Sequence, residues 1–164
     1  MLLMRHASAG ERLASAAADR ARGLDAAGRA DARGLAAALS AHAIERIVSS
    51  PHARCLQSVE PLARLRGLTV EVREELAPGA SPDETLALLG ELRDDSLVCT
   101  HREVFERLFG GEITCEKGGT WIVEGGVPVA YVPPPSSALP PRRAATARPR
   151  DRRRAPVHAR RSRP

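Results

Sequence analysis

Four side chains that can bind or attack a phosphoryl group lie where three short apolar runs of the sequence end. They are Arg5 and His6 after Leu2–Met4, Arg54 within a turn of Ile47–Ser50, and His101 directly after Leu97–Thr100. Short apolar runs of this kind are typical of buried strands. Because ligands of open α/β sheets bind outside the carboxyl ends of parallel strands, we expect the four side chains to meet at one edge of a sheet.

The chemistry that these residue types suggest is phosphoryl transfer, which needs a nucleophile, positive charge on the phosphoryl oxygens and a proton donor. The guanidinium forks of Arg5 and Arg54 can each pair with two phosphate oxygens. His6 is a competent nucleophile when neutral, and His101 is expected to donate to the same phosphate as an imidazolium. Ser8 is expected to hydrogen-bond the phosphate or the loop at His6. Since the guanidinium groups supply positive charge, we expect neither a metal ion nor another cofactor.

The elements that must position these side chains are predicted from the pattern of the remaining segments. Further strands are predicted at 68–72, 120–123 and 127–132, and helices at 28–41, from Pro51 onward, at 81–93 and at 103–109. Strands that alternate with helices favour an α/β three-layer sandwich, in which helices cover both faces of a mostly parallel sheet. Glu124-Gly125-Gly126 suits a hairpin, so the last two strands are expected to form an antiparallel C-terminal edge.

The turn after the second apolar run carries more specific expectations. Ser50 is predicted to cap the following helix, with Pro51 in its first turn, and His52 is predicted to face solvent. Pro61 falls inside the same helical pattern and is expected to kink or split the helix. The Ala-rich segment 11–22 is predicted to be a loop or short helix over the mouth of the site.

Length and composition are consistent with a soluble globular protein. The chain has 164 residues, of which 43% are hydrophobic, and this is enough for one domain with a substantial core. No apolar run approaches the roughly 18 residues of a membrane span, and Arg5 interrupts the apolar start that a signal peptide would continue. Cys55, Cys99 and Cys115 lack the spacing of a zinc site, so we expect free thiols, no structural metal and a cytoplasmic location.

Charge divides the chain into two unequal parts. The net charge is +5, but residues 134–164 carry ten Arg and one Asp and contribute +9, so the rest carries −4. The sequence therefore predicts a folded domain over 1–133 and a disordered Pro/Arg-rich tail over 134–164, which lacks the apolar residues needed to offset its ordering entropy. Nucleic acid is expected to bind at most nonspecifically, through this tail.

Three motifs surround the four candidate side chains, and together they resemble a known family. They are Arg5-His6-Ala7, Ser49-Ser50-Pro51-x-x-Arg54-x-x-Gln57-Ser58 and Leu97-Val98-Cys99-Thr100-His101. In this order the chain resembles the histidine phosphatase superfamily over about residues 1–133, and most closely its small phosphohistidine phosphatase branch. Arg22-x-Leu24-Asp25-x-x-Gly28 is similar to the segment that comes after the first motif there. The resemblance implies that His6 becomes phosphorylated and that Arg5, Arg54 and His101 complete the pocket.

The chain departs from the family at the expected general acid. Many members carry that acid two residues after the leucine that this chain has at Leu76, where Pro78 stands here. Glu75 is the candidate among the acidic residues nearby. Because imidazole leaves more easily than an alkoxide when no acid protonates it, a missing acid favours phosphohistidine or another activated phosphate as the substrate. The expected partner is a phosphohistidine protein or a phosphorylated small molecule, and not a membrane.

Two other functions remain open. Arg102 after His101, together with Lys117-Gly118-Gly119-Thr120-Trp121, resembles the phosphatase domain fused to Nudix hydrolases in some bacteria, which implies a nucleotide phosphatase with Arg102 as a possible substrate contact. The alternative from a different class is a non-catalytic phosphate-binding module that uses the Arg-rich tail to hold nucleic acid. The tail lacks aromatic residues on which bases would stack.

Overall fold

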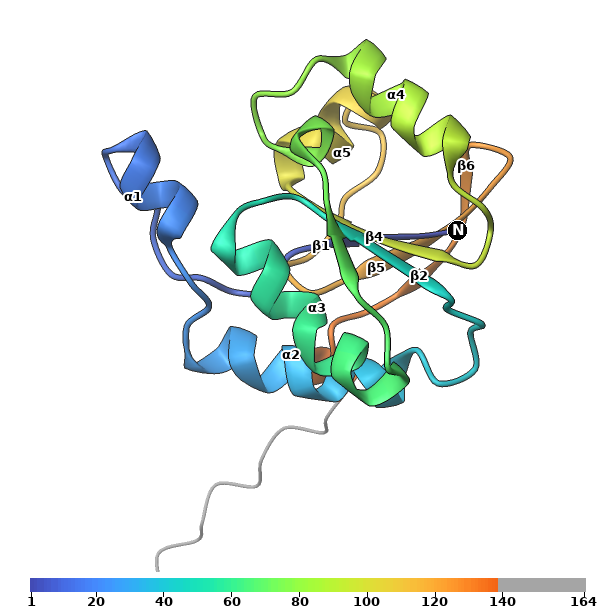
Figure 1. The fold of residues 1–164 in the computed structure, drawn as a ribbon, viewed down its shortest axis with the longest axis horizontal. Coiled ribbons are helices and arrows are strands. Elements are labelled where there is room, and N and C mark those ends of the chain that lie inside the picture. Colours follow the sequence, from blue (N-terminus) through green and yellow to red (C-terminus); the bar gives the residue numbers. More distant parts are fainter. Residues whose placement is uncertain (139–164) are drawn as a thin grey trace, which may run out of the picture.

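The computed structural model describes residues 1–138, which form one six-stranded sheet and the helices that pack on it (Figure 1). The strands are β1 (Leu2–Arg5), β2 (Arg46–Ser49), β3 (Val70–Val72), β4 (Ser96–Thr100), β5 (Thr120–Glu124) and β6 (Val127–Val132). The helices are α1 (Ala16–Ala21), α2 (Ala26–Ala38), α3 (Ala53–Arg66), α4 (Pro82–Glu91) and α5 (Arg102–Phe109), with short 3-10 helices η1 (Glu74–Leu76) and η2 (Pro135–Ala138). Within this part of the chain, none of the helices has the length and apolar character that crossing a lipid bilayer requires.

The strand order of the sheet is β3-β2-β4-β1-β5-β6. The strands β3, β2, β4 and β1 run parallel, whereas β5 pairs antiparallel with both β1 and β6. This arrangement confirms the predicted α/β fold, with a mostly parallel sheet and an antiparallel C-terminal hairpin. Arg5 lies opposite Thr100, and Ser49 lies opposite Cys99, so the carboxyl ends of β1, β4 and β2 are neighbours.

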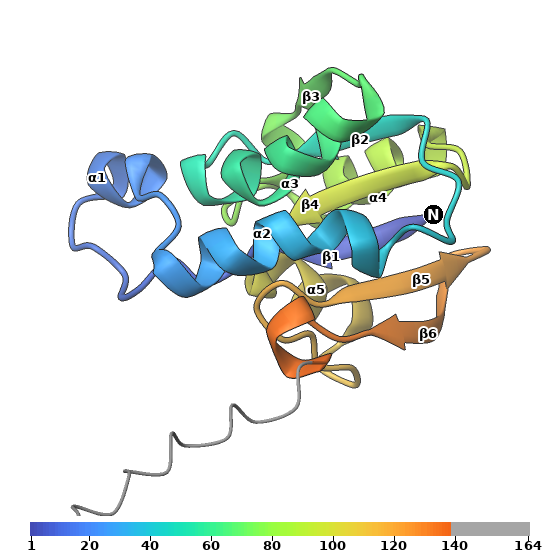
Figure 2. The same cartoon turned by 90° about the horizontal axis from the view of Figure 1, so that it is seen from below.

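The apolar side chains of the central strands divide between the two faces of the sheet. Ile47 and Leu97 belong to a buried cluster with residues of α2 and α3, whereas Val48 and Val98 belong to another with residues of α4 and α5. Figure 2 shows α2 and α3 in front of the sheet and α4 and α5 behind it. Because successive strand residues point to opposite faces, these short apolar runs fill both cores.

Local capping decides where several helices begin and end. The Asp25 carboxylate accepts a hydrogen bond from the backbone N–H of Gly28 (2.8 Å), so α2 begins at Ala26, two residues before the predicted start. The predicted capping box of Ser81 and Glu84 begins α4. Gly110 ends α5 with φ of 60°, in the left-handed region that favours glycine.

The structure corrects the predicted cap of α3 and excludes a split of this helix at Pro61. Ser50 does not cap α3, because the helix begins at Ala53 and the Ser50 hydroxyl contacts two imidazole rings instead. Pro61 does not split the pattern, since α3 continues to Arg66 as a single helix. Buried Val59 and Leu62 on either side of Pro61 hold this helix against the sheet, and their packing offsets the missing backbone hydrogen bond.

The packed part of the chain reaches at least to Ser136, three residues beyond the predicted domain boundary. The backbone N–H of Ser136 donates to the Asp31 carboxylate of α2 (2.9 Å), and Pro135 lies beside Gly34 of the same helix. The α2 surface therefore provides both a hydrogen-bond acceptor and room for the first turn after β6. The rest of the predicted tail, residues 139–164, lies outside the described residues.

Replacing Gly28 by alanine is expected to lower the free energy of unfolding by about 1–3 kcal/mol, as overpacked substitutions do. A Cβ atom there would lie 1.9 Å from the backbone oxygen of Ser8, in the loop after His6. Chemical denaturation would measure the loss. Gly90→Ala in α4 is the matched control, because a Cβ there meets nothing within 4 Å, and it should leave stability unchanged or raise it. Equal stabilities of the two variants would contradict this account of Gly28.

Candidate active site

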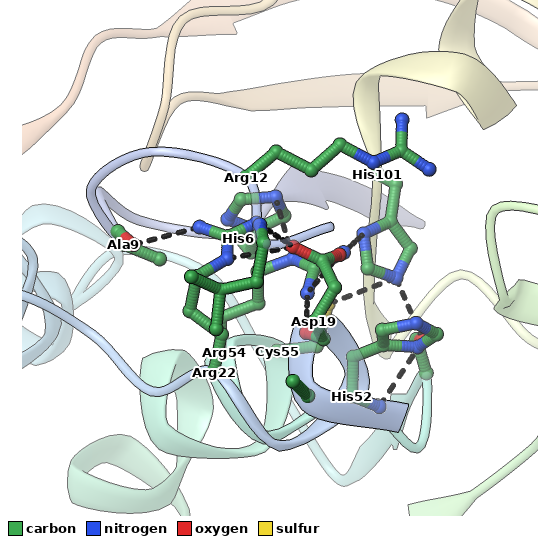
Figure 3. A network of polar contacts seen from close by, with 12 residues as sticks. His6, Ala9, Arg12, Asp19, Arg22, His52, Arg54, Cys55 and His101 are labelled. Carbon is green, nitrogen blue, oxygen red and sulfur yellow. Dashed lines mark hydrogen bonds and ion pairs between the residues drawn. The ribbon is translucent and has the colours of Figure 1, made fainter. Parts of the chain in front are cut away.

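The parallel strands bring the candidate side chains to one edge of the sheet. His6 directly follows β1, His101 directly follows β4, and Arg54 lies in the first turn of α3 after β2. The ring centroids of His6 and His101 are 5.2 Å apart. Figure 3 shows Arg54 between these two rings, with Asp19 and Arg22 beside it. The spatial convergence expected from the strand ends is therefore present in the structure.

His6 is held with Nε2 as its unprotonated ring nitrogen, the one that can act as a nucleophile. Its Nδ1–H donates to the backbone oxygen of Ala7 (2.8 Å), which leaves the lone pair on Nε2, 3.3 Å from Nε of Arg54. The ring is 8% exposed, and burial together with the charges of Arg54 and Arg5 lowers the pKa of His6 to about 3. His6 is consequently a neutral imidazole near pH 7, as a nitrogen nucleophile must be.

Arg54 connects the two histidines to the segment that covers them. Its Nε points to His6 Nε2 and its Nη2 to His101 Nδ1, both at 3.3 Å. Its Nη1 donates to the backbone oxygen of Asp19 (2.7 Å) and lies 3.3 Å from the Asp19 carboxylate. All three guanidinium nitrogens are thus directed at fixed positions, which makes this side chain a preorganised anion donor.

His101 is fully buried and neutral in this structure. Burial lowers the pKa of His101 far below its ordinary value, and the neighbouring His6 and Arg54 lower it further. Its Nδ1 faces Arg54, and its Nε2 lies 2.8 Å from the Ser50 hydroxyl. The predicted imidazolium is therefore not the form favoured without a ligand. Only a bound anion next to Nδ1 would favour a proton there.

Arg5 approaches the same pocket from the end of β1. Its Nη1 donates to the backbone oxygen of Cys115 (2.8 Å), which anchors one side of the guanidinium. Its Nε is buried and has no hydrogen-bond partner within residues 1–138. The residue as a whole lines the pocket, and a guanidinium fork held in this way is suited to an oxyanion.

Arg5, His6 and Arg54 line one strongly cationic pocket of about 200 Å³, while the fully buried His101 lies behind Arg54 and outside its lining. The pocket lining contains six cationic and two acidic side chains, together with His6, Ala9 and Gly10; the charged ones are Arg5, Arg12, Asp19, Arg22, Arg54, Arg102, Glu103 and Lys117. A concave surface with this excess of positive charge attracts anions. Its size and charge fit a single phosphoryl group better than an apolar ligand.

Two candidates from the sequence are not brought into this pocket. The Ser8 hydroxyl donates to the Asp25 carboxylate (2.6 Å), so it supports the loop after His6 from outside the pocket lining. Glu75 is paired with Arg73 (2.7 Å) and lines a different hollow, beside α4. The 3-10 turn η1 directs its side chain back toward β3, so the geometry corrects the assignment of Glu75 as a general acid.

Glu75→Gln is expected to leave kcat within about twofold of the unaltered protein, whereas removal of a true general acid costs roughly 10²–10⁴-fold. The hydrogen bond from Arg73 lowers the pKa of Glu75, so this carboxylate holds no proton to donate near pH 7. Steady-state hydrolysis of an alkyl phosphate, which needs an acid most, is the measurement. A fall of about 100-fold would restore Glu75 as the acid.

Two residues of the pocket were given no site role from the sequence: Asp19, which no motif includes, and Arg22, which was quoted only as the start of a segment after the first motif. The Ala-rich segment 11–22 forms α1, and its predicted place over the mouth of the site is confirmed by the pocket lining. The Asp19 carboxylate accepts from Nε of Arg22 (2.8 Å) and from the backbone N–H of Leu13. Although burial opposes ionisation, these hydrogen bonds and Arg54 lower the pKa of Asp19 to about 2. Asp19 and Arg22 have opposite charges three residues apart, and this spacing is the feature of the sequence from which their ion pair could have been predicted.

His52 also differs from its prediction, since it is only partly exposed. Its ring packs edge-on against His101 with centroids 4.7 Å apart, and its Nδ1 lies 3.2 Å from the Ser50 hydroxyl. A turn that displaces the start of α3 to Ala53 places His52 directly beneath the site.

A family model and several solved structures resemble this chain. The family model "Histidine phosphatase superfamily (branch 1)" matches residues 1–78. The protein histidine phosphatase SixA complexed with tungstate is 25% identical, with a TM-score of 0.67 over 83% of this chain and 97% of that one. A candidate phosphohistidine phosphatase SixA from Agrobacterium tumefaciens has 23% identity and a TM-score of 0.66 over 81% and 96%. The protein TTHB049 from Thermus thermophilus shares the fold at 18% identity, with a TM-score of 0.61 over 80% and 98%. No curated protein matches significantly.

Proposed function

We propose that this chain, whose residues 1–78 match the histidine phosphatase family model, is a phosphatase that hydrolyses phosphohistidine or another activated phosphate through a phosphorylated His6. The observation that supports this most directly is the placement of Arg54 between two neutral imidazoles, where its Nε–H donates to the lone pair of His6 Nε2 beside the pocket. A nucleophile, a bidentate anion donor and a second imidazole are thereby within reach of one phosphoryl group.

In the first step, His6 Nε2 attacks phosphorus, the new N–P bond forms, and the bond from phosphorus to the leaving group breaks. The guanidinium groups of Arg54 and Arg5, which both line the pocket, bind the phosphoryl oxygens, on which negative charge is concentrated. In the second step, water attacks the phosphohistidine and the N–P bond breaks, which returns His6 to its neutral form. Since guanidinium groups supply the positive charge, we expect turnover to persist in EDTA.

The acidic groups of the pocket favour a substrate whose leaving group needs little help. Asp19 has a pKa of about 2 and is ionised near pH 7, so it cannot donate a proton to an alkoxide. Glu103 is partly exposed and interacts with Arg12 at 3.8 Å. An imidazole or another good leaving group departs without a strong acid, and for this reason we propose phosphohistidine on a protein as the preferred substrate class.

The experiment that tests this proposal is a substrate comparison with purified protein in EDTA. A phosphohistidine peptide and p-nitrophenyl phosphate should be hydrolysed, and a simple alkyl phosphate should be hydrolysed at least about 100-fold more slowly, the contribution of a missing acid. Phosphate release would be followed together with acid-quench detection of a phosphorylated histidine. If none of the three compounds releases phosphate, or if the alkyl ester is the best of them, the proposal fails.

A nucleotide phosphatase is the second candidate, and one observation favours it. Arg102 and Lys117 line the mouth of the pocket beyond His6, where a second phosphate of a nucleotide would lie. A panel of nucleoside mono-, di- and triphosphates tested beside the phosphohistidine peptide would separate the two. Higher kcat/KM for the nucleotides, reduced by Arg102→Ala, would favour this function, whereas equal or lower values would reject it.

A further inference from the structure

A continuous chain of hydrogen bonds runs from the pocket to a partly exposed side chain below it. Arg54 Nη2 faces His101 Nδ1 (3.3 Å), His101 Nε2 faces the Ser50 hydroxyl (2.8 Å), and that hydroxyl faces His52 Nδ1 (3.2 Å). Figure 3 shows His101 above His52, joined by these contacts. The two steps of the proposed phosphatase reaction give no role to Ser50 or His52.

The partners assign a direction to every hydrogen in this chain. A guanidinium can only donate, so His101 Nδ1 accepts from Arg54 and the proton of the neutral ring is on Nε2. The Nε2–H then donates to Ser50 Oγ, and the serine hydroxyl donates its own hydrogen to His52 Nδ1. Cys55 Sγ, 3.5 Å from Nε2, donates to the backbone oxygen of Thr100 and does not compete for this role.

Burial and charge differ at the two ends of the chain. His101 is fully buried next to Arg54, whereas His52 is partly exposed and opens onto a hollow of about 230 Å³ beside α1. A positive charge costs more on a buried imidazole beside a guanidinium than on a ring in contact with solvent. A proton that reaches His101 therefore has a favourable route outward, along hydrogen bonds already formed.

We propose that His52 is a positioning residue that acts through Ser50 to fix the tautomer of His101 and to take up its proton during hydrolysis of the phosphorylated enzyme. This inference rests on the proposed function. Water attacks phosphorus while the N–P bond to His6 breaks. Arg54 Nη2 then donates to a phosphoryl oxygen instead of to His101 Nδ1, and the freed lone pair of Nδ1 takes up one water proton. The Nε2 proton of His101 moves to Ser50 Oγ, the serine proton moves to His52 Nδ1, and His52 then releases a proton to solvent.

The mechanism requires a neutral His52 and therefore predicts a pH dependence of the second step. Burial and the charge of Arg54 lower the pKa of His52 below its ordinary value. The other charged groups that act on it come from neighbouring elements: Arg20 lowers the pKa, while Asp19 and Glu74 raise it. Since the neutral ring is the acceptor, the rate of phosphoenzyme hydrolysis should fall as the pH decreases through this pKa, below 6.5.

The test compares His52→Asn with the full chain by rapid-quench kinetics of p-nitrophenyl phosphate hydrolysis. Asparagine keeps an oxygen that can accept from Ser50 but cannot take up a proton. We expect phosphoenzyme hydrolysis to slow about tenfold, less than the roughly 100-fold of a whole general base, and its decline at acidic pH to disappear. Formation of the phosphoenzyme should change less than about twofold. His42→Asn, the same change at the opposite end of the strands, is the control and should alter neither step.

A second variant separates proton transfer from a structural role. In His52→Ala, added imidazole should enter the vacated space beside the hollow and restore most of the lost hydrolysis rate, whereas it should not affect His42→Ala. Wild-type rates and pH dependence in His52→Asn, or failure of imidazole to restore His52→Ala, would overturn the inference. If the unaltered protein forms no phosphoenzyme at all, the proposed function itself fails, and the two failures are thereby distinguished.

Discussion

His6→Ala is expected to abolish turnover, with kcat/KM falling by about 10⁴-fold or more, as when a covalent nucleophile is removed. Nε2 of His6 is the nitrogen that faces the pocket, since Nδ1–H is committed to the backbone oxygen of Ala7. Neither His101, whose Nδ1 faces Arg54, nor partly exposed His52 replaces it at phosphorus. The measurement is phosphate release from p-nitrophenyl phosphate, with acid-quench detection of the phosphorylated histidine.

A matched control distinguishes lost chemistry from lost folding. His42→Ala removes an imidazole at the opposite end of the sheet and should retain full activity. His6→Gln keeps a polar side chain of similar length in the buried position, and it should also be inactive while melting close to the unaltered protein. Turnover by either His6 variant at a rate near that of the parent would rule out a covalent intermediate on this residue.

Arg54→Lys is expected to lower kcat/KM by about 10²–10³-fold, the cost of removing one preorganised donor at a developing charge. The guanidinium directs three nitrogens at His6, His101 and Asp19, and its planar fork can bind two phosphoryl oxygens. An ammonium group keeps the charge but supplies a single flexible point contact. We expect most of the loss in kcat, because the fork is matched to the transferring phosphoryl group.

Arg64→Lys is the control for this substitution, since Arg64 lies on the same helix and its side chain is exposed. It should change kcat/KM less than about twofold, in line with the small contribution of exposed ion pairs. Arg54→Lys should remain folded, because the introduced ammonium group still faces the Asp19 carboxylate. Equal activity of the two variants would show that the phosphoryl group does not bind beside Arg54.

The fold class, and the edge of the sheet at which the chemistry is expected, follow from local patterns in the sequence. Apolar runs that stop at His6 and at His101 are recognisable as strands because buried strands need continuous apolar residues. Parallel strands then place the residues that follow them at a common edge of the sheet. These side chains meet because the strands that precede them run in the same direction. The capping box at Ser81 and the helix stop at Gly110 could be predicted from the sequence because each acts within one turn of its own helix.

Tertiary structure alone decided which partners each side chain has. Ser50 is suited to a helix cap by its local sequence, yet β4 places His101 within 2.8 Å of its hydroxyl. Glu75 is near the family's acid position along the chain, but Arg73 holds it in another hollow. Local patterns specify backbone conformation, whereas hydrogen bonds and burial depend on residues distant in sequence. The pKa of His6 and the ionisation of Asp19 follow from that burial, so only the folded chain could reveal them.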